Sequence, residues 1–260
     1  MTVRWDPAQY LRYADERGRP FADLLARVGA VAPHSVADLG CGPGNLTATL
    51  RERWPLATVV GVDSSPEMVE AARRDFGTDP LLTFERADLR EWRLPEALDV
   101  AVCNATLHWV PGHETLLASW ADALQPGAWL AVQVPGNFEE PSHRSIAEVR
   151  GRPRWRDRLA AVEARPSVAE PATYLALLAE RGLRADVWET TYLHVLPGED
   201  AVLGWLRGTG LRPVLGVLDE GEQQEFEAEL AELLRTAYPR QAYGTVLPFR
   251  RIFLVGEKVA

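Results

Sequence analysis

The stretch that decides the fold reads Ser35-Val36-Ala37-Asp38-Leu39-Gly40-Cys41-Gly42-Pro43-Gly44. Its first half is the short apolar run of a buried β-strand, and its second half is a glycine-rich turn. Residues 45–53 then have the pattern of a helix that ends before Pro55. A strand, a glycine turn and a helix in this order bring the backbone close to a nucleotide-like ligand. The turn at residues 40–44 is therefore predicted to line a ligand site.

Four more apolar runs follow, and the segments between them have helical patterns. The predicted strands cover residues 58–62, 82–87, 99–103 and 129–134. Ser65-Pro66-Glu67 supplies the cap, the proline and the acid of a helix start, and residues 113–124 are predicted as a further helix. Five strands that alternate with helices predict a parallel sheet with right-handed crossovers, so the predicted fold class is α/β.

The composition limits the classes of partner. The 260 residues are 47% apolar and 25% charged, as in an ordinary globular protein. A net charge of −9 argues against a nucleic-acid partner, because binding to phosphates needs a basic surface. Two cysteines, no signal-peptide pattern and no run near the roughly 18 apolar residues of a membrane span predict a cytoplasmic protein without a membrane partner. Seven arginines lie in residues 144–165, where each is more often a solvated surface group than a ligand-binding one.

Three acids accompany the glycine turn. The turn alone is a weak signal, because glycines also follow strands for purely steric reasons. Asp38 precedes the turn, while Asp63 and Asp88 end the second and third predicted strands. Asp63 is placed to accept both hydroxyls of a ribose, and Asp88 to accept a hydrogen bond from an adenine amino group. Carboxylates repel phosphates but favour an ammonium and a sulfonium, and no Lys or Arg follows in the first helical turn. The pattern therefore favours S-adenosylmethionine over a nicotinamide cofactor or ATP.

Three blocks resemble the seven-stranded S-adenosylmethionine-dependent methyltransferases. They are Asp38-Leu39-Gly40-Cys41-Gly42-Pro43-Gly44, Gly61-Val62-Asp63-Ser64-Ser65-Pro66-Glu67-Met68 and Ala87-Asp88-Leu89. The resemblance implies a seven-stranded, mostly parallel Rossmann-like sheet with helical cap insertions. In that family the glycine loop and its acid hold the methionine part of the cofactor, Met68 would pack near the adenine, and Asn104 would border cofactor and acceptor. Tyr10 is an aromatic of the N-terminal arm that we expect to lie over a ligand. The predicted cofactor-binding residues are Tyr10, Asp38, Gly40, Gly42, Gly44, Asp63, Ser64, Met68, Asp88, Leu89 and Asn104.

The chain is predicted to form a single methyltransferase domain over residues 1–260. Its parts are an N-terminal helical arm (1–34), a cofactor-binding core (35–135), cap segments (136–184 and 197–246) and two late sheet strands (185–196 and 249–255). Within the cap segments, helices are predicted at residues 142–150, 155–164, 171–181, 199–207 and 219–238. Open α/β sheets bind ligands at the carboxyl edge of their strands, where such a cap would close the pocket.

A narrower resemblance extends over almost the full length. The matching segments are Trp5-Asp6-Pro7, Asn104-Ala105 with Leu107 and Trp109, Gln133-Val134-Pro135 with Asn137, Trp188 with Thr190-Thr191-Tyr192, and Thr209-Gly210-Leu211-Arg212-Pro213. They are similar to the trans-aconitate 2-methyltransferase family, which esterifies one carboxylate of a small unsaturated tricarboxylic acid. The remaining carboxylates of such a polyacid need fixed positive partners. The predicted substrate-binding residues are Tyr10, Trp109, Tyr192, Arg212 and Arg251, although Arg212 fits a surface turn equally well.

The predicted reaction needs no general base. A carboxylate with a pKa near 4 is already ionised at pH 7, so catalysis would come from positioning and from the exclusion of water. No catalytic residue and no metal ligand is predicted. One alternative is a methyltransferase of the same fold with another acceptor, for which His108 is the candidate base. The other is a non-enzymatic S-adenosylmethionine-binding regulatory protein, and the oligomeric state stays open.

Overall fold

The computed structural model describes residues 14–162 and 168–259, which form two compact units. The sheet unit contains residues 14–135, 168–189 and 251–259, and the helical unit contains residues 136–162 and 190–250. The sequence instead predicts one domain with cap segments at 136–184 and 197–246. The differences lie in residues 168–184, which group with the sheet unit, and in residues 190–196 and 247–250, which group with the helical unit.

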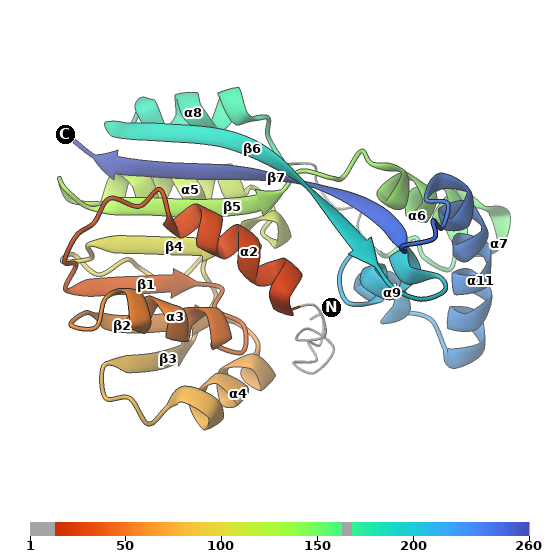
Figure 1. Cartoon of the computed structure of the whole chain (residues 1–260), viewed down its shortest axis with the longest axis horizontal. Coiled ribbons are helices and arrows are strands. Elements are labelled where there is room, and N and C mark those ends of the chain that lie inside the picture. The colour runs from red at the N-terminus through yellow and green to blue at the C-terminus, as the bar shows by residue number, and fades with distance from the viewer. Residues whose placement is uncertain (1–13, 163–167, 260) are drawn as a thin grey trace. The chain divides into compact units, whose positions relative to one another are not determined.

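A seven-stranded sheet runs through the fold in the order β3-β2-β1-β4-β5-β7-β6 (Figure 1). Its strands are β1 (Ser35–Leu39), β2 (Thr58–Asp63), β3 (Leu82–Arg86), β4 (Val100–Asn104), β5 (Trp129–Pro135), β6 (Leu183–Leu196) and β7 (Thr245–Lys258). The first five strands pair in parallel, and β7 pairs antiparallel with β5. The predicted mostly parallel α/β sheet is confirmed. The last strand is longer than the predicted 249–255.

Helices cover both faces of the sheet in its own unit. They are α2 (Ala14–Leu25), α3 (Asn45–Arg53), α4 (Pro66–Phe76), the 3₁₀ turn η1 (Leu107–Trp109), α5 (His113–Ala123) and α8 (Pro171–Ala179). Helix α2 lies in front of the sheet and α5 and α8 lie behind it (Figure 1). The predicted start of α4 is confirmed, because the Ser65 Oγ accepts the Met68 N–H at 3.3 Å. Helix α8 matches the prediction for 171–181, but it packs on α5, where Tyr174 and His113 share a 2.6 Å hydrogen bond.

The helical unit contains α6 (Pro141–Gly151), α7 (Pro153–Arg156), α9 (Ala201–Arg207), α10 (Arg212–Leu215) and α11 (Glu220–Ala237). Asp219 and Glu222 form a capping box at the start of α11. The prediction of a helix over 155–164 is wrong, because α7 ends at Arg156. Contacts with α11 hold this segment: the Trp155 indole N–H donates to Glu229 at 2.9 Å, and its ring meets Phe226 edge-on at 5.4 Å.

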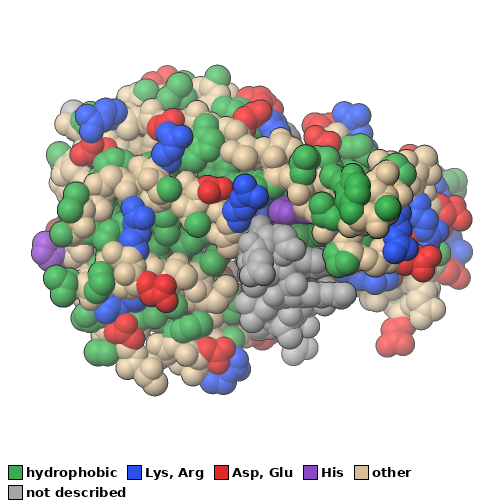
Figure 2. All heavy atoms as spheres, in the orientation of Figure 1, with side chains coloured by type: hydrophobic (Ala, Val, Ile, Leu, Met, Phe, Trp, Pro, Cys, Tyr) green, Lys and Arg blue, Asp and Glu red, His purple; other side chains and the backbone are tan. Residues whose placement is uncertain are grey.

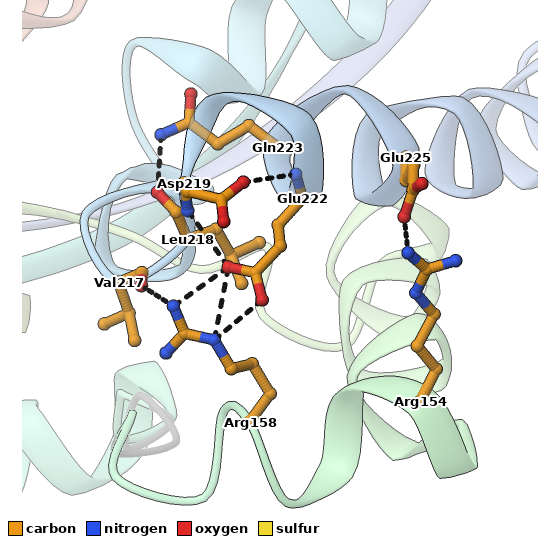
Figure 3. A network of polar contacts seen from close by, with 8 residues as sticks. All are labelled: Arg154, Arg158, Val217, Leu218, Asp219, Glu222, Gln223 and Glu225. Carbon is orange, nitrogen blue, oxygen red and sulfur yellow. Dashed lines mark hydrogen bonds and ion pairs between the residues drawn. The ribbon is translucent and has the colours of Figure 1, made fainter.

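Arginines of the 144–165 segment pair with acids of α11 (Figure 3). Arg158 donates to the Glu222 carboxylate at 2.9 Å and to the Val217 carbonyl at 2.6 Å. Arg154 pairs with Glu225, and Arg152 with Glu229 at 2.7 Å. These ion pairs are partly exposed, so each is expected to contribute little to stability. Their partners are carboxylates of the fold itself.

Charges of both signs are interspersed over the described residues of the face in Figure 2. None of the described helices combines the length and the apolar character needed to cross a bilayer.

Candidate functional site

The glycine turn after β1 has the backbone conformation that only glycine adopts readily. Gly40, Gly42 and Gly44 have φ angles of 85°, 55° and 81°. A side chain at Gly40 would overlap Thr106, and one at Gly44 would approach Ala72 at 2.9 Å. At Gly42, by contrast, a Cβ would meet no described atom within 4 Å. Gly40 and Gly44 are therefore needed for packing, whereas Gly42 presents its backbone to open space.

Asp63 ties this turn to the start of α4. One carboxylate oxygen accepts the Gly42 N–H at 2.9 Å, and the other accepts the Ser65 N–H at 2.9 Å. Burial raises the pKa of Asp63, and the hydrogen bonds from backbone N–H groups oppose that shift. The carboxylate is thus held in one orientation at the end of β2, where the sequence predicts the ribose-binding acid. The neighbouring Ser64 is exposed, and Met68 is buried on α4.

Asp38 is buried beneath the same turn, with 3% of its surface exposed. The Thr47 hydroxyl on α3 donates to its carboxylate at 2.7 Å. Burial raises the pKa of Asp38 to about 7, the Thr47 bond opposes the shift, and the charge of Asp63 adds to it. A carboxyl group in this state gains from a nearby cation, because the cation favours the ionised form. The sequence does not identify Thr47, since a threonine early in a helix has many other roles.

Asp88 lies just beyond β3, as predicted, but its carboxylate faces Arg90. The Arg90 guanidinium donates to it at 2.5 Å, and the Arg90 backbone N–H at 2.9 Å. These hydrogen bonds hold the pKa of Asp88 below its usual range. Leu89 beside it is buried. The predicted contact of Asp88 with an adenine stays a prediction, and the structure adds Arg90 as a competing partner.

The segment after β4 packs against the glycine turn, where the Thr106 hydroxyl donates to the Gly40 carbonyl at 3.2 Å. Asn104 ends β4 with 9% of its surface exposed, and its Oδ1 has no hydrogen-bond partner among the described residues. Ala105 then adopts a left-handed φ of 54°, a strained conformation for a residue with a side chain. His108 is buried, and its ring centroid lies 5.2 Å from that of the partly exposed Trp109. A role of His108 at the edge of a substrate pocket stays a prediction.

Gln133 on β5 and Arg251 on β7 form a second buried polar group at this edge of the sheet. Gln133 is 0% exposed and Arg251 is 4% exposed. The Arg251 guanidinium donates to the Gln133 Oε1 at 3.0 Å. Gln133 is the register partner of Asn104, so the two side chains extend from the same face of the sheet. The sequence predicts Arg251 as a site residue but not Gln133, although a glutamine between Val132 and Val134 is a visible break in an apolar strand.

The other predicted substrate residues are distributed over different parts of the chain. Tyr192 and Arg212 belong to the helical unit, whereas Trp109 and Arg251 belong to the sheet unit. Tyr192 is buried and stacks with His194 at 6.2 Å. Arg212 begins the short helix α10, not the surface turn that the sequence also allows. Tyr10 lies outside the described residues, and the common substrate pocket stays a prediction.

Among the described residues, no three His, Cys, Asp or Glu side chains gather as metal ligands. Both cysteines, Cys41 and Cys103, are buried free thiols. Burial raises the pKa of each thiol, which disfavours the reactive thiolate.

Known proteins resemble the chain in sequence and in fold. A family model described as "Methyltransferase domain" matches residues 36–127. Trans-aconitate 2-methyltransferase of Streptomyces coelicolor is 53% identical over 262 residues, which covers 98% of this chain and 86% of that protein. The protein of the same name from Rhodococcus jostii is 52% identical over 256 residues, 97% of this chain and 99% of that protein. The YcgJ protein of Bacillus subtilis shares the fold with a TM-score of 0.59 at 15% identity, over 93% of this chain and 99% of that one. With this similarity over nearly its full length, the chain belongs to the trans-aconitate 2-methyltransferase family.

Proposed function

We propose that this protein transfers the methyl group of S-adenosylmethionine to a carboxylate oxygen of trans-aconitate or a closely related small polycarboxylic acid. The C–S bond of the sulfonium breaks, an O–C ester bond forms, and S-adenosylhomocysteine leaves. No proton is exchanged, because the acceptor carboxylate is ionised at neutral pH.

One observation supports the proposal beyond family membership. Two acids, one buried and one half-buried, and a buried arginine lie on different strands of the same sheet edge. Asp38 and Asp63 are on β1 and β2, and Arg251 is on β7. A sulfonium donor favours the acidic strands and a polyanionic acceptor favours the arginine. A nucleotide phosphate would be repelled by Asp38 and Asp63.

The residues of the glycine turn fit the adenosyl cofactor. Gly42 leaves room for a ligand beside the backbone, and the Asp63 carboxylate is held in place for a ribose. Asp38 would face the positively charged methionine part, which stabilises its ionised form. When bound, S-adenosylmethionine supplies an electrophilic methyl group. Because the acceptor carboxylate is already ionised, no base is needed, and the protein's part is to orient donor and acceptor and to exclude water.

Methyl transfer is tested by incubating the protein with S-adenosylmethionine and trans-aconitate and analysing the products by mass spectrometry. We expect a monomethyl ester in amounts equal to the S-adenosylhomocysteine formed. A panel with a phenol and an amine as acceptors serves as the comparison. If no ester forms above background while another acceptor is methylated, the substrate assignment is contradicted. Cofactor binding by calorimetry without turnover on any acceptor would support a regulatory role instead.

The setting of this reaction is also part of the proposal. The net charge of −9 and the two free thiols lead us to expect a cytoplasmic enzyme whose partner is a small polycarboxylate and not a nucleic acid.

A further inference from the structure

Gln133 is a polar side chain in the protein interior. Buried polar side chains normally either form all their hydrogen bonds or serve a function. Gln133 is completely buried near the carboxyl end of β5. Its Oε1 accepts from Arg251, but its Nε2 has no hydrogen-bond partner among the described residues. A buried donor without a partner is costly, and most buried polar atoms in folded proteins do have one. The amide therefore calls for an acceptor group that is bound at this point.

The orientation of the amide follows from its partner. A guanidinium has only donors, so the amide group must turn its oxygen toward Arg251. The opposite assignment would set two N–H donors against each other. The Nε2 is therefore the atom that can donate to another group, and the hydrogen bond from Arg251 fixes the amide in this orientation.

The location of the free donor is the edge where acceptor and cofactor would meet. Gln133 and Asn104 are register partners at the ends of β5 and β4. The Ala105 N–H donates to the Gln133 carbonyl at 2.9 Å, which holds the segment after β4 against β5. Ligands of open parallel sheets bind beyond these strand ends.

We propose that the Gln133 Nε2 donates a hydrogen bond to the carboxylate that accepts the methyl group, and that Arg251 is the positioning residue that orients the Gln133 amide. This inference rests on the proposed function. A neutral amide suits the reacting carboxylate, because it orients the oxygen without neutralising its charge. A guanidinium in direct contact would reduce the nucleophilicity of that oxygen. Arg251 instead binds the Oε1 of the Gln133 amide, so its positive charge lies on the side of the amide opposite the Nε2 donor.

Two substitutions test the contact. Gln133→Glu keeps the size and offers Arg251 a carboxylate partner, but it removes the donor and adds a negative charge. Gln133→Met removes the donor without adding charge. With saturating cofactor, we expect kcat/KM for trans-aconitate to fall roughly 10- to 100-fold in Gln133→Met and further in Gln133→Glu. Affinity for S-adenosylhomocysteine, measured by calorimetry, is expected to stay within about threefold of wild type in Gln133→Met.

A matched control is Gln125→Glu, which makes the same charge change at an exposed glutamine after α5. It should leave every parameter unchanged. Melting curves of all variants separate folding from function. A lower melting temperature with unchanged KM and kcat would overturn the inference, because Gln133 would then merely pair with Asn104 in the core.

Calorimetry with trans-aconitate in the presence of S-adenosylhomocysteine distinguishes this inference from the proposed function. Binding to wild type that weakens in both Gln133 variants supports the contact, even if no ester forms and the proposed function fails. If wild type forms the ester and Gln133→Met shows unchanged binding and turnover, the Gln133 contact is refuted and the proposed function stands. If wild type neither forms the ester nor binds trans-aconitate, both proposals are refuted.

Discussion

The carboxyl edge of the sheet has two halves of opposite chemistry. The half on β1 and β2 carries the buried Asp38 and the half-buried Asp63, and the half on β5 and β7 carries the buried Gln133 and Arg251. Strand β4 lies between them, so neighbouring-strand spacing puts β1 and β5 about 10 Å apart. A cationic methyl donor and an anionic acceptor need such a division, because an edge of one charge would repel one of them. From this comparison we expect acceptor preference to depend on the strands beyond β4.

The largest effect is expected from breaking the acidic half at Asp63. Asp63→Ala removes the predicted ribose contact and the acceptor of the Gly42 and Ser65 N–H groups. We expect the Kd for S-adenosylmethionine to rise roughly 10- to 100-fold, since a lost bond of this kind costs about 1–3 kcal/mol. Calorimetry measures this, with Asp75→Ala at an exposed carboxylate of α4 as the control. Unchanged cofactor affinity would refute the role of Asp63.

Asp38 offers a pH test of the same half. Burial raises its pKa in the folded state to about 7, far above that of an unfolded aspartate. Between about pH 4 and pH 7 the folded state then binds more protons, so this group makes the free energy of unfolding decrease as pH rises. Asp38→Asn removes that dependence and keeps an acceptor for Thr47. Its melting temperature relative to wild type should therefore be higher at pH 8 than at pH 5, by an amount equivalent to about 1–3 kcal/mol.

Cofactor binding should show the complementary trend. A cation binds the ionised form of Asp38, so the affinity of wild type for S-adenosylmethionine should increase as pH rises through 7. Asp38→Asn should bind more weakly and lose the trend. Parallel melting temperatures of variant and wild type at all pH values would show that Asp38 is ionised throughout.

The acidic half could be predicted from sequence because its parts are local. Each acid lies at or near the carboxyl end of a strand within residues 35–88, and the glycines stand in one contiguous turn. What sequence could not provide is side-chain direction. Whether Asp88 faces a ligand or Arg90 depends on a rotamer, and the Thr47 contact depends on how α3 packs against β1.

The other half depends on pairing between distant segments. Gln133 and Arg251 are 118 residues apart and meet only because β7 pairs antiparallel with β5 in one register. A shift by one residue would turn Arg251 to the opposite face. The arginine could be predicted because the remaining carboxylates of a polyacid need fixed positive partners, but its partner Gln133 could not. The weak periodicity after residue 135 likewise gave the helix over 155–164 that the structure does not have.

A smaller effect is expected from His108, which lies between the two halves. If the acceptor is a carboxylate, no base is needed, and kcat at saturating cofactor and acid should be nearly flat from pH 6 to 9. His108→Asn should lower kcat only a few-fold through altered packing beside Trp109. A loss of about 100-fold or more, together with the disappearance of a titration near neutrality, would identify His108 as a base for a weakly acidic acceptor.

The smallest effect is expected at the arginines of the helical unit, which test whether positive charge alone makes an acceptor site. Arg158 pairs with Glu222 in a partly exposed contact (Figure 3), unlike the buried Arg251, which meets a neutral amide. Arg158→Gln should lower the free energy of unfolding only slightly and leave the KM for the acid unchanged. Denaturant unfolding and steady-state kinetics measure the two quantities. A clear rise in KM without loss of stability would move part of the acceptor site to the arginine-rich segment, and the division between the two sheet halves would then be incomplete.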